Sequence, residues 1–516
     1  MSRHAMQRVR IAPAPVAFDE QFYAQLRKTP WVGLSLVVHG VVLGLFLLIP
    51  ASPPREAPVV VATAALAPLD EVALDDPPPP DPNEHVDSID EPESVPENVE
   101  IDETFQRDDD LPTAGALGDP EFIASAPFEE RSLNSTIGIA GGAGGAFGDR
   151  VGGHRNGGGT GGRGRRGRDV EREAVDDALD WLARHQSPTG NWDADGFDAQ
   201  CRTNRCGGLG EAPYDPGVSG LALLAFLGTG ETHTAGPHRE VVKRGLGWLR
   251  DIQDSEGCIG PRTSGHFQYN HTIATLALAE AYGLTGSKLL REPAQRAIGF
   301  VQTSQNPYLA WRYGVRDGDN DTSVTGWAVM ALKSAKMAGL EVDGGAFRGA
   351  LAWVDKMTEP ELGRVGYQRR GGAPARTNEM LERFPAENSE SMTAVGVLTR
   401  VFCGQDPAQE PLIGRGTELL ARRTPRWDVD AGTIDMYYWY YGTLAMFQVG
   451  GESWKTWNQA MRGAIVDTQR KDRALDEHGS WDPLGPWGPE GGRVYSTATM
   501  ALCLEVYYRY ERVFGR

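Results

Sequence analysis

The C-terminal two thirds of the chain alternate between two hydrophobic patterns. From residue 170 onward, short amphipathic stretches recur with an aromatic or aliphatic residue at the same place in each copy. Successive copies lie about 45 to 67 residues apart, a spacing that fits one helical hairpin per copy. The copies are "ALDWLARHQ" (178–186), "GLGWLRDIQ" (245–253), "AIGFVQTSQ" (297–305), "ALAWVDKMT" (350–358) and, less closely, "GTELLARRT" (416–424) and "RGAIVDTQ" (462–469).

Between these stretches lie six segments that are apolar or small on almost every side. A helix that is apolar all round is buried, whereas an amphipathic helix keeps one charged face in water. Six alternating pairs therefore predict an inner ring of helices inside an outer ring, an all-α α6/α6 toroid of six helical hairpins over residues 170–516. The six apolar segments are "GVSGLALLAFLG", "NHTIATLALAEAYG", "TSVTGWAVMALKSA", "SMTAVGVLTRVF", "MYYWYYGTLAMF" and "YSTATMALCLEVYY".

A separate apolar run, "WVGLSLVVHGVVLGLFLLIP" (31–50), predicts one transmembrane helix. Residues 31–49 carry no charge and would form a helix about 28 Å long, which is enough to cross the hydrocarbon core of a bilayer. Basic residues predominate before this run and acidic residues after it, so we expect residues 1–30 in the cytoplasm and the main domain outside. These features indicate a single-pass protein of a bacterial inner membrane with a periplasmic main domain. A cleaved signal peptide is the alternative, because "PAS" (50–52) offers a cleavage site.

The apolar run contains a polar pair and a pair of glycines. Ser35 and His39 are four residues apart and share one helix face. Gly40 and Gly44 form a G-x-x-x-G motif, which lets a second helix approach closely. Since polar groups in membranes usually face protein or water, we expect a protein partner for this helix. The S-x-x-x-H spacing before an acidic, proline-rich stretch resembles the anchor of TonB-type energy transducers, which implies that Ser35 and His39 face a proton-driven, proton-channel-type partner. A histidine tolerated without function is the alternative.

Charge is concentrated in the segment after the anchor. Residues 51–131 hold 22 Asp and Glu against three Arg, which alone matches the net charge of −19 of the whole chain. Residues 51–136 are acidic and rich in proline, a composition that predicts a long disordered stalk. Residues 137–169 predict a flexible linker rich in glycine and arginine. Because the remainder is close to neutral, we expect no nucleic-acid partner.

Five cysteines are too few for a fold built on disulfides. Cys201 and Cys206 lie in the loop-like stretch "CRTNRC". This spacing suits a local disulfide, half of a metal site, or two unpaired loop cysteines, and the sequence leaves all three open. We expect no cofactor and assign no metal ligands from the sequence.

The end of the first amphipathic copy carries a more specific motif. "QSPTGNW" places Gln186, Gly190 and Trp192 at the Q-x3-G-x-W spacing, and Gln469 with Trp481 forms a longer version. The spacing resembles the QW repeat of squalene-hopene and oxidosqualene cyclases. The domain is thus similar, over about 345 residues, to the terpenoid-cyclase and protein-prenyltransferase toroid superfamily. The resemblance implies that Gln186, Trp192, Gln469 and Trp481 tie neighbouring repeats together and are structural.

The resemblance also suggests a candidate acid. Class II cyclases protonate an alkene or epoxide with the middle Asp of a D-x-D-D motif, and such an acid must be dry and held by neighbouring groups. In "RDGDNDTSVTGW", Asp319 and Asp321 align with this motif, which implies that Asp321 is the acid, whereas Thr322 replaces the last Asp. The prenyltransferase zinc motif Asp-x-Cys does not occur in the sequence, and "CGQD" (403–406) lacks the spacing of a complement-type thioester.

Polar and aromatic residues gather where the apolar segments begin. If the six inner helices run the same way, their N-termini surround one mouth, where helix dipoles and side-chain donors favour a polar or anionic group. N-capping explains one polar residue per helix, while neighbouring aromatics suit a ligand pocket. The expected ligand-binding residues are Asn270, His271, Glu390, Asp435, Tyr437, Tyr438, Trp439 and Tyr495.

These patterns lead to one functional hypothesis with two alternatives. We expect a membrane-anchored toroid of the cell envelope that binds a peptide, glycan or lipid-derived ligand, while its transmembrane helix docks on a membrane partner. The first alternative is a terpenoid-cyclase-like enzyme with Asp321 as general acid. The second is a structural scaffold of the envelope.

Overall fold

The computed structural model describes His39 and residues 165–506. Contacts divide the chain into two units, 1–103 and 104–516, and all the helices described below belong to the second. His39 is the one described residue of the first unit, and it is helical. Within the described residues no helix is both long and apolar enough to cross a membrane. The expected features outside the described residues are the anchor at 31–50 with Ser35, Gly40 and Gly44, the stalk at 51–136 and most of the linker at 137–169.

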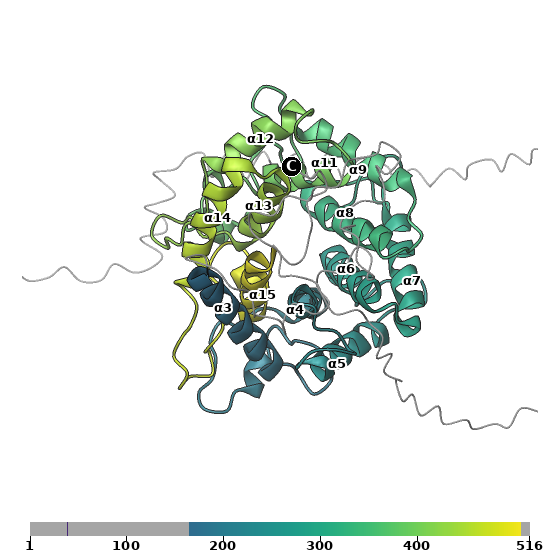
Figure 1. Ribbon diagram of the computed structural model, residues 1–516. Helices are drawn as coiled ribbons and strands as arrows, with labels where there is room; N and C mark the ends of the chain where they lie inside the picture. The colour runs from purple at the N-terminus through teal and green to yellow at the C-terminus, as the bar shows by residue number, and fades with distance from the viewer. Residues whose placement is uncertain (1–38, 40–164, 507–516) are drawn as a thin grey trace, which may run out of the picture. The chain divides into compact units, whose positions relative to one another are not determined.

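Long helices follow one another around a ring (Figure 1). The inner helices are α4 (Asp215–Gly228), α6 (Phe267–Thr285), α8 (Thr322–Met337), α11 (Ser391–Phe402), α13 (Met436–Val449) and α15 (Gly488–Leu504). The outer helices are α3 (Arg165–Arg184), α5 (Arg239–Asp251), α7 (Lys288–Ser304), α9 (Gly344–Met357), α12 (Pro411–Ala421) and α14 (Gly451–Val466). The loops hold the short helices η3 (Phe197–Gln200), η4 (Ala212–Tyr214), α10 (Asn378–Leu381) and η5 (Ala386–Asn388).

The inner helices form a closed ring. Each contacts the next, and α15 contacts both α4 and the first outer helix, α3. In Figure 1 the last helix, in yellow, accordingly lies beside the first, in dark blue. Each amphipathic copy falls on an outer helix, and each apolar segment on an inner one. The sequence-based prediction of an all-α toroid is therefore confirmed for the described residues, which contain no strands beyond two isolated bridges.

Small residues bring neighbouring inner helices close together. A Cβ at Gly220 in α4 would lie 3.0 Å from the backbone nitrogen of Ala274 in α6. A larger side chain there would have to push the two helices apart. The abundance of glycine and alanine in the apolar segments therefore has a packing reason.

Glutamines at the ends of outer helices brace the ring. Gln186 donates from Nε2 to the carbonyls of Gly190, at 2.8 Å, and of Val241 in α5, at 2.9 Å. Trp192 donates from its indole to the carbonyl of Leu182 at the end of α3, at 2.7 Å. The same double contact joins Gln253 to Gly257 and Pro293, Gln305 to Leu309 and Ala346, and Gln469 to Gly479 and Ala174.

The glycine of this motif is required by its conformation and its neighbour. Gly190 has φ +100°, and a Cβ there would lie 2.5 Å from the carbonyl oxygen of Arg244 in α5. Gly479 repeats the arrangement against the carbonyl of Asp177 in α3. Gln469 thus holds the last repeat to the first through Ala174, whereas Trp481 donates to the carbonyl of Ile465 within the last repeat.

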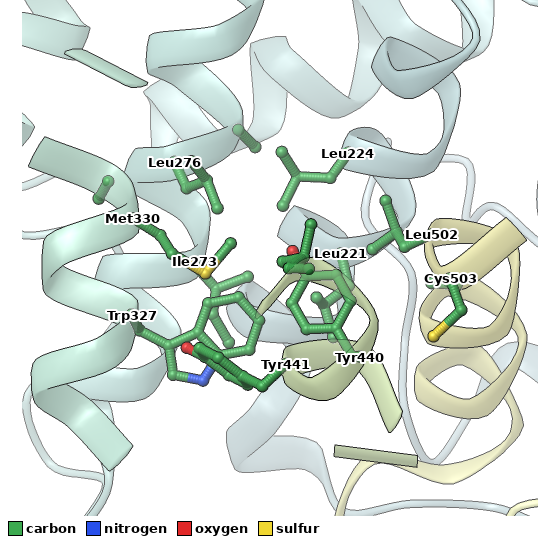
Figure 2. Packing of buried hydrophobic residues seen from close by; sticks show 14 of the residues in the cluster. Leu221, Leu224, Ile273, Leu276, Trp327, Met330, Tyr440, Tyr441, Leu502 and Cys503 are labelled. Carbon is green, nitrogen blue, oxygen red and sulfur yellow. The ribbon is translucent and has the colours of Figure 1, made fainter. Parts of the chain in front are cut away.

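The middle of the ring is filled by apolar side chains. Figure 2 shows Leu224 of α4, Leu276 of α6, Met330 of α8, Tyr440 of α13 and Leu502 of α15 gathered there. All five belong to one buried hydrophobic cluster. The inner ring is therefore a packed barrel, and a ligand has room only where the packing ends.

Candidate functional site

A cavity of about 290 Å³ lies at the N-terminal ends of the inner helices. Every inner helix contributes to its lining, and so do the loops that precede α8, α11 and α15. Because all six inner helices reach the cavity with their N-terminal parts, they are parallel to one another, with their N-termini at the same end of the ring. The lining residue closest to each inner-helix start is Gly217, Tyr269, Ser323, Ser391, Tyr437 and Glu490 respectively.

Nine aromatic side chains line the cavity. Tyr214 and His266 stack with their rings 6.4 Å apart, and the Tyr214 hydroxyl lies 3.3 Å from Nδ1 of His266. The ring of Tyr313 meets His266 edge-on at 4.5 Å. Such a wall offers flat apolar faces together with hydroxyl groups. The aromatic lining residues are Tyr214, His266, Tyr269, Tyr313, Trp327, Tyr367, Tyr437, Trp487 and Tyr495.

Asp321 lies directly behind this wall. It is fully buried, and as the N-cap of α8 it accepts at Oδ1 from the backbone N–H of Val324, at 2.8 Å. Its Oδ2 accepts from the Tyr367 hydroxyl at 3.1 Å and lies 3.7 Å from Nε of Arg312. Burial raises the pKa of Asp321 from 3.8 to about 7, against the lowering effect of these partners. Near neutral pH the carboxyl is therefore poised between its two protonation states.

Two tyrosines connect Asp321 with the cavity. The hydroxyls of Tyr367 and Tyr313 lie 2.7 Å apart, and both residues line the cavity, whereas Asp321 does not. Tyr367 thus provides a hydrogen-bonded path between Asp321 and the cavity. The chain Asp321–Tyr367–Tyr313 is the one part of the site that combines a buried acid, a hydrogen-bonded path and an apolar chamber.

The other members of the D-x-D-D-like motif have different roles. The Asp319 side chain is 67% exposed and pairs with Arg312 at 3.0 Å, so it lies outside the cavity. Asn320 accepts from the backbone N–H of Ala310 at 2.9 Å and fastens the loop. Thr322, which replaces the last Asp of the motif, donates to the carbonyl of Gly366 at 2.6 Å. Of the motif, only Asp321 has the environment of an acid.

A second N-cap aspartate, Asp435 of α13, carries an ion pair. Its Oδ1 accepts from the Tyr438 backbone N–H at 3.0 Å, and its Oδ2 lies 2.7 Å from the Arg376 guanidinium. Both side chains are at most 4% exposed. Arg376 lines the cavity and also donates to the carbonyls of Phe384 and Ala375. The positive charge beside the cavity is therefore already neutralised by Asp435.

The expected ligand-binding residues separate into two groups. Asn270, Tyr437 and Tyr495 line the cavity. Asn270 bridges the carbonyl of Pro213 and the N–H of Gly217, and Tyr437 bonds to Ser323 at 2.7 Å between hydroxyls.

The Tyr495 hydroxyl belongs to a residue that lines the cavity. It is buried and has no hydrogen-bond partner among the described residues. Glu490 lies five residues earlier on the same lining, before the kink of α15 at Gly492, and burial raises its pKa.

The remaining members of the set do not line the cavity, which differs from the prediction that all eight residues share one ligand pocket. His271 is buried against the edge of Phe300, accepts from the N–H of Ile259 at 3.0 Å, and has its pKa lowered by burial to about 3. Tyr438 donates to the carbonyl of Arg423. These residues face away because neighbours on a helix point about 100° apart. Trp439 packs on Trp427, Glu390 pairs with Arg364, and Asp435 pairs with the lining residue Arg376. The expected residues that do not line the cavity are therefore His271, Tyr438, Trp439, Glu390 and Asp435.

Several lining residues were not among those predicted from the sequence. Tyr367 and Arg376 come from the long loop between α9 and α11, which has no hydrophobic period. Tyr313 and Trp487 precede α8 and α15 in the same way. A weak signal existed in the loop composition, since an arginine and aromatics in a long loop before a buried helix suit a covering segment.

No protein-family model matches the chain, and no curated protein matches its sequence. Among solved structures, it is similar to an inactive variant of an α-1,6-mannanase of Salegentibacter sp. in complex with α-1,6-mannotriose (TM-score 0.45, 11% identity, 66% of this chain and 99% of that one). It is also similar to an α-amylase from Clostridium perfringens (TM-score 0.43, 10% identity, 65% and 97%). A type II terpene cyclase from Scytonema has TM-score 0.41, 12% identity and coverage of 67% and 99%. At such scores the likeness carries no functional weight, and the toroid is given by the helix contacts of the chain itself.

Proposed function

We propose that the toroid binds an amphipathic, lipid-derived small molecule in the cavity at the inner-helix N-termini. The observation that carries the proposal is a polarity gradient along the inner helices. The first turns present Asn270, Ser323 and Ser391 to the cavity. One turn deeper, the lining is Leu221, Ile273 and Trp327, which continue into the buried core.

This gradient favours a molecule with an apolar body and a small polar end. The apolar part would lie against Leu221, Ile273 and Trp327, and the polar end would meet the unpartnered Tyr495 hydroxyl and Glu490. A glycan needs polar partners along its whole length, and the deep part of the cavity lacks them. A peptide of more than a few residues exceeds a chamber of about 290 Å³.

The N-terminal apolar run fits the same proposal. A helix at 31–50 would hold the toroid beside the inner membrane, where lipid-derived compounds concentrate, and the segment 51–169 would let it reach the bilayer surface. Docking of Ser35 and His39 on a proton-driven partner belongs to this proposal and has its own test. Equal recovery of membrane partners by the full-length protein and by a His39→Ala variant would contradict it.

Binding can be tested with the full-length protein in lipid nanodiscs. Geranylgeraniol should change the fluorescence of the lining residues Trp327 and Trp487 saturably, whereas mannotriose should not. Ile273→Trp fills the cavity and should abolish the change in signal. Leu289→Trp, at a residue of the outer helix α7 that is 38% exposed and does not line the cavity, is the matched control and should bind normally. Saturable binding of mannotriose alone would overturn the lipid assignment.

A second candidate function is acid catalysis on such a ligand. It is favoured by one observation, the buried Asp321 with a pKa of about 7 joined through Tyr367 to the cavity. In this case Asp321 would give a proton through Tyr367 to an alkene carbon, and the resulting cation would cyclise. The cyclised cation would then lose a different proton to water, so the neutral product retains the proton that was added. Incubation with a polyprenyl substrate in D₂O should then yield a product carrying solvent deuterium, and Asp321→Asn should yield none. Unchanged substrate with the wild-type protein would leave only the binding function.

A further inference from the structure

A second cluster of chemically reactive side chains lies away from the cavity, at the end of the first outer helix. His185 follows α3 directly, and Cys201 and Cys206 flank the next loop. Nε2 of His185 is 3.5 Å from the sulfur of Cys201 and 3.5 Å from that of Cys206. The three atoms lie within 4.8 Å of one another, and the two cysteines are not joined by a disulfide. We call these three residues the His–Cys cluster.

The imidazole of the cluster is held in one tautomer. Its Nδ1 lies 2.8 Å from the carbonyl of Trp181, to which it donates. The lone pair of Nε2 therefore points at the two sulfurs. The ring also stacks on the indole of Trp181 at 4.2 Å and meets Phe197 edge-on. A fixed ring whose second nitrogen bonds to a backbone carbonyl is the usual support of a metal-binding histidine.

The distances match the edge of a metal tetrahedron. Zinc lies about 2.3 Å from thiolate sulfur and about 2.0–2.1 Å from imidazole nitrogen, so at the tetrahedral angle sulfur and nitrogen are about 3.6 Å apart. Both nitrogen–sulfur distances in the cluster agree with that separation. A single lone pair on Nε2 can accept one thiol hydrogen bond well, so two sulfurs at equal distance are better explained by a shared ion.

We propose that His185, Cys201 and Cys206 bind a zinc ion, with solvent or a small exogenous ligand as the fourth donor. Two thiolates and one imidazole form a ligand set that zinc prefers over harder metals. Two thiolates would balance the charge of Zn²⁺, which removes the cost of burying either alone. Binding releases the two thiol protons to solvent.

The nearby carboxylates are already engaged, which leaves the fourth position open. Asp476 accepts from the backbone N–H groups of Arg202, Thr203 and Asn204, the turn between the two cysteines. Glu477 accepts from the side chain of Asn204. Neither is a member of the cluster.

These contacts also show what the ion would do. Asp476 and Glu477 belong to the loop between α14 and α15, in the last repeat, while the cysteine loop belongs to the first. In the same region Arg184 donates to the carbonyl of His478 at 3.0 Å. Zinc would fasten the cysteine loop to the end of α3 and so stabilise the contact that closes the ring.

The test is the metal content of the full-length protein purified without chelator or added metal. The expected result is about one zinc per chain, and after exchange with cobalt an absorption band from thiolate-to-cobalt charge transfer. The variant Cys201→Ser/Cys206→Ser should hold less than about a tenth of the wild-type zinc. Cys403→Ser, a half-buried cysteine outside the cluster, is the matched control and should keep the metal.

Measurements on the wild-type protein alone decide the proposal, whether or not the variants fold. Removing zinc with a chelator should lower the melting temperature, and adding it back should restore the original value. Absence of stoichiometric metal together with absence of the cobalt band would overturn the proposal. A chain lighter by two hydrogens, with a peptide linking Cys201 and Cys206, would replace it with a disulfide.

Discussion

Two aspartates begin inner helices in the same way and differ in one partner. Asp321 caps α8 through a bond from the Val324 N–H at 2.8 Å, and Asp435 caps α13 through a bond from the Tyr438 N–H at 3.0 Å. Both carboxylates are buried. The second oxygen of Asp321 meets the hydroxyl of Tyr367, whereas that of Asp435 meets the guanidinium of Arg376.

The second partner decides what each aspartate contributes. A phenol donates a hydrogen bond but no charge, and the nearest guanidinium, that of Arg312, stays 3.7 Å from Asp321 at its Nε. Burial therefore prevails and raises the pKa of Asp321 to about 7. A guanidinium supplies the opposite charge and fixes Asp435 in an ion pair that joins α13 to the loop containing Arg376. The N-cap of α8 is thus a carboxyl with a pKa near neutrality, whereas the N-cap of α13 is one half of a structural ion pair.

Asp435→Asn should have the largest effect on stability. Asparagine keeps the cap, but it leaves the Arg376 guanidinium, whose side chain is 2% exposed, without its counter-charge. Removing one partner of a buried ion pair costs about 3–5 kcal/mol. Urea unfolding followed by circular dichroism should show a loss of this size.

The matched control for this variant is Asp343→Asn. Asp343 caps the outer helix α9 by accepting from the N–H of Gly345 at 2.8 Å, in an exposed contact. Its replacement should cost less than about 1 kcal/mol, because asparagine caps nearly as well. Equal losses at positions 435 and 343 would show that the ion pair with Arg376 contributes nothing.

Asp321→Asn should change the pH dependence of stability. The folded pKa, about 7, lies above the unfolded value of 3.8, so the folded protein keeps a proton that the unfolded chain loses. The contribution of Asp321 to wild-type stability is therefore fully present below pH 4 and is lost as the pH rises from 4 to about 7, by up to about 4 kcal/mol. The variant lacks this loss, so its free energy of unfolding should gain on that of the wild type between pH 4 and 8. A constant difference between the two proteins across this range would contradict a raised pKa.

The sequence predicted the helices of this arrangement better than the loops. Alternating amphipathic and apolar segments predicted the two rings. A helix buried on one side has apolar residues at helical spacing, and a helix buried on all sides is apolar throughout. A polar residue before each apolar segment likewise pointed to Asp321 and Asp435. The D-x-D-D-like motif led to Asp321 even though Asp319 is exposed and Thr322 serves the backbone.

The sequence did not predict which side chain contacts each N-cap aspartate, nor which residues of each inner helix face the cavity. Tyr367 and Arg376 come from one aperiodic loop, so nothing in their spacing assigns one to Asp321 and the other to Asp435. Asn270 and His271 are adjacent, and a turn of about 100° puts the first on the cavity and the second against Phe300. The His–Cys cluster joins a helix end to a loop, and only the folded chain brings these together.

Tyr367→Phe should produce the smallest change and the most selective one. It removes the hydroxyl that donates to Asp321, a bond that lowers the pKa of this carboxyl, so the pKa should rise further above 7. The substitution should lower the free energy of unfolding by about 1 kcal/mol, because the hydroxyl of Tyr367 is hydrogen-bonded both to Asp321 and to the Tyr313 hydroxyl.

The pH at which wild-type stability levels off should therefore move upward in Tyr367→Phe, while the cap from Val324 and the ion pair of Asp435 stay intact. Carbon-13 NMR of labelled aspartate can follow the Asp321 titration directly. Tyr440→Phe offers a control, because Tyr440 is another buried tyrosine and does not line the cavity. A titration of Asp321 that is the same in wild type and in Tyr367→Phe would show that this hydrogen bond does not set the pKa of Asp321. The difference between the two aspartates would then have to come from their arginines, Arg312 at 3.7 Å and Arg376 at 2.7 Å.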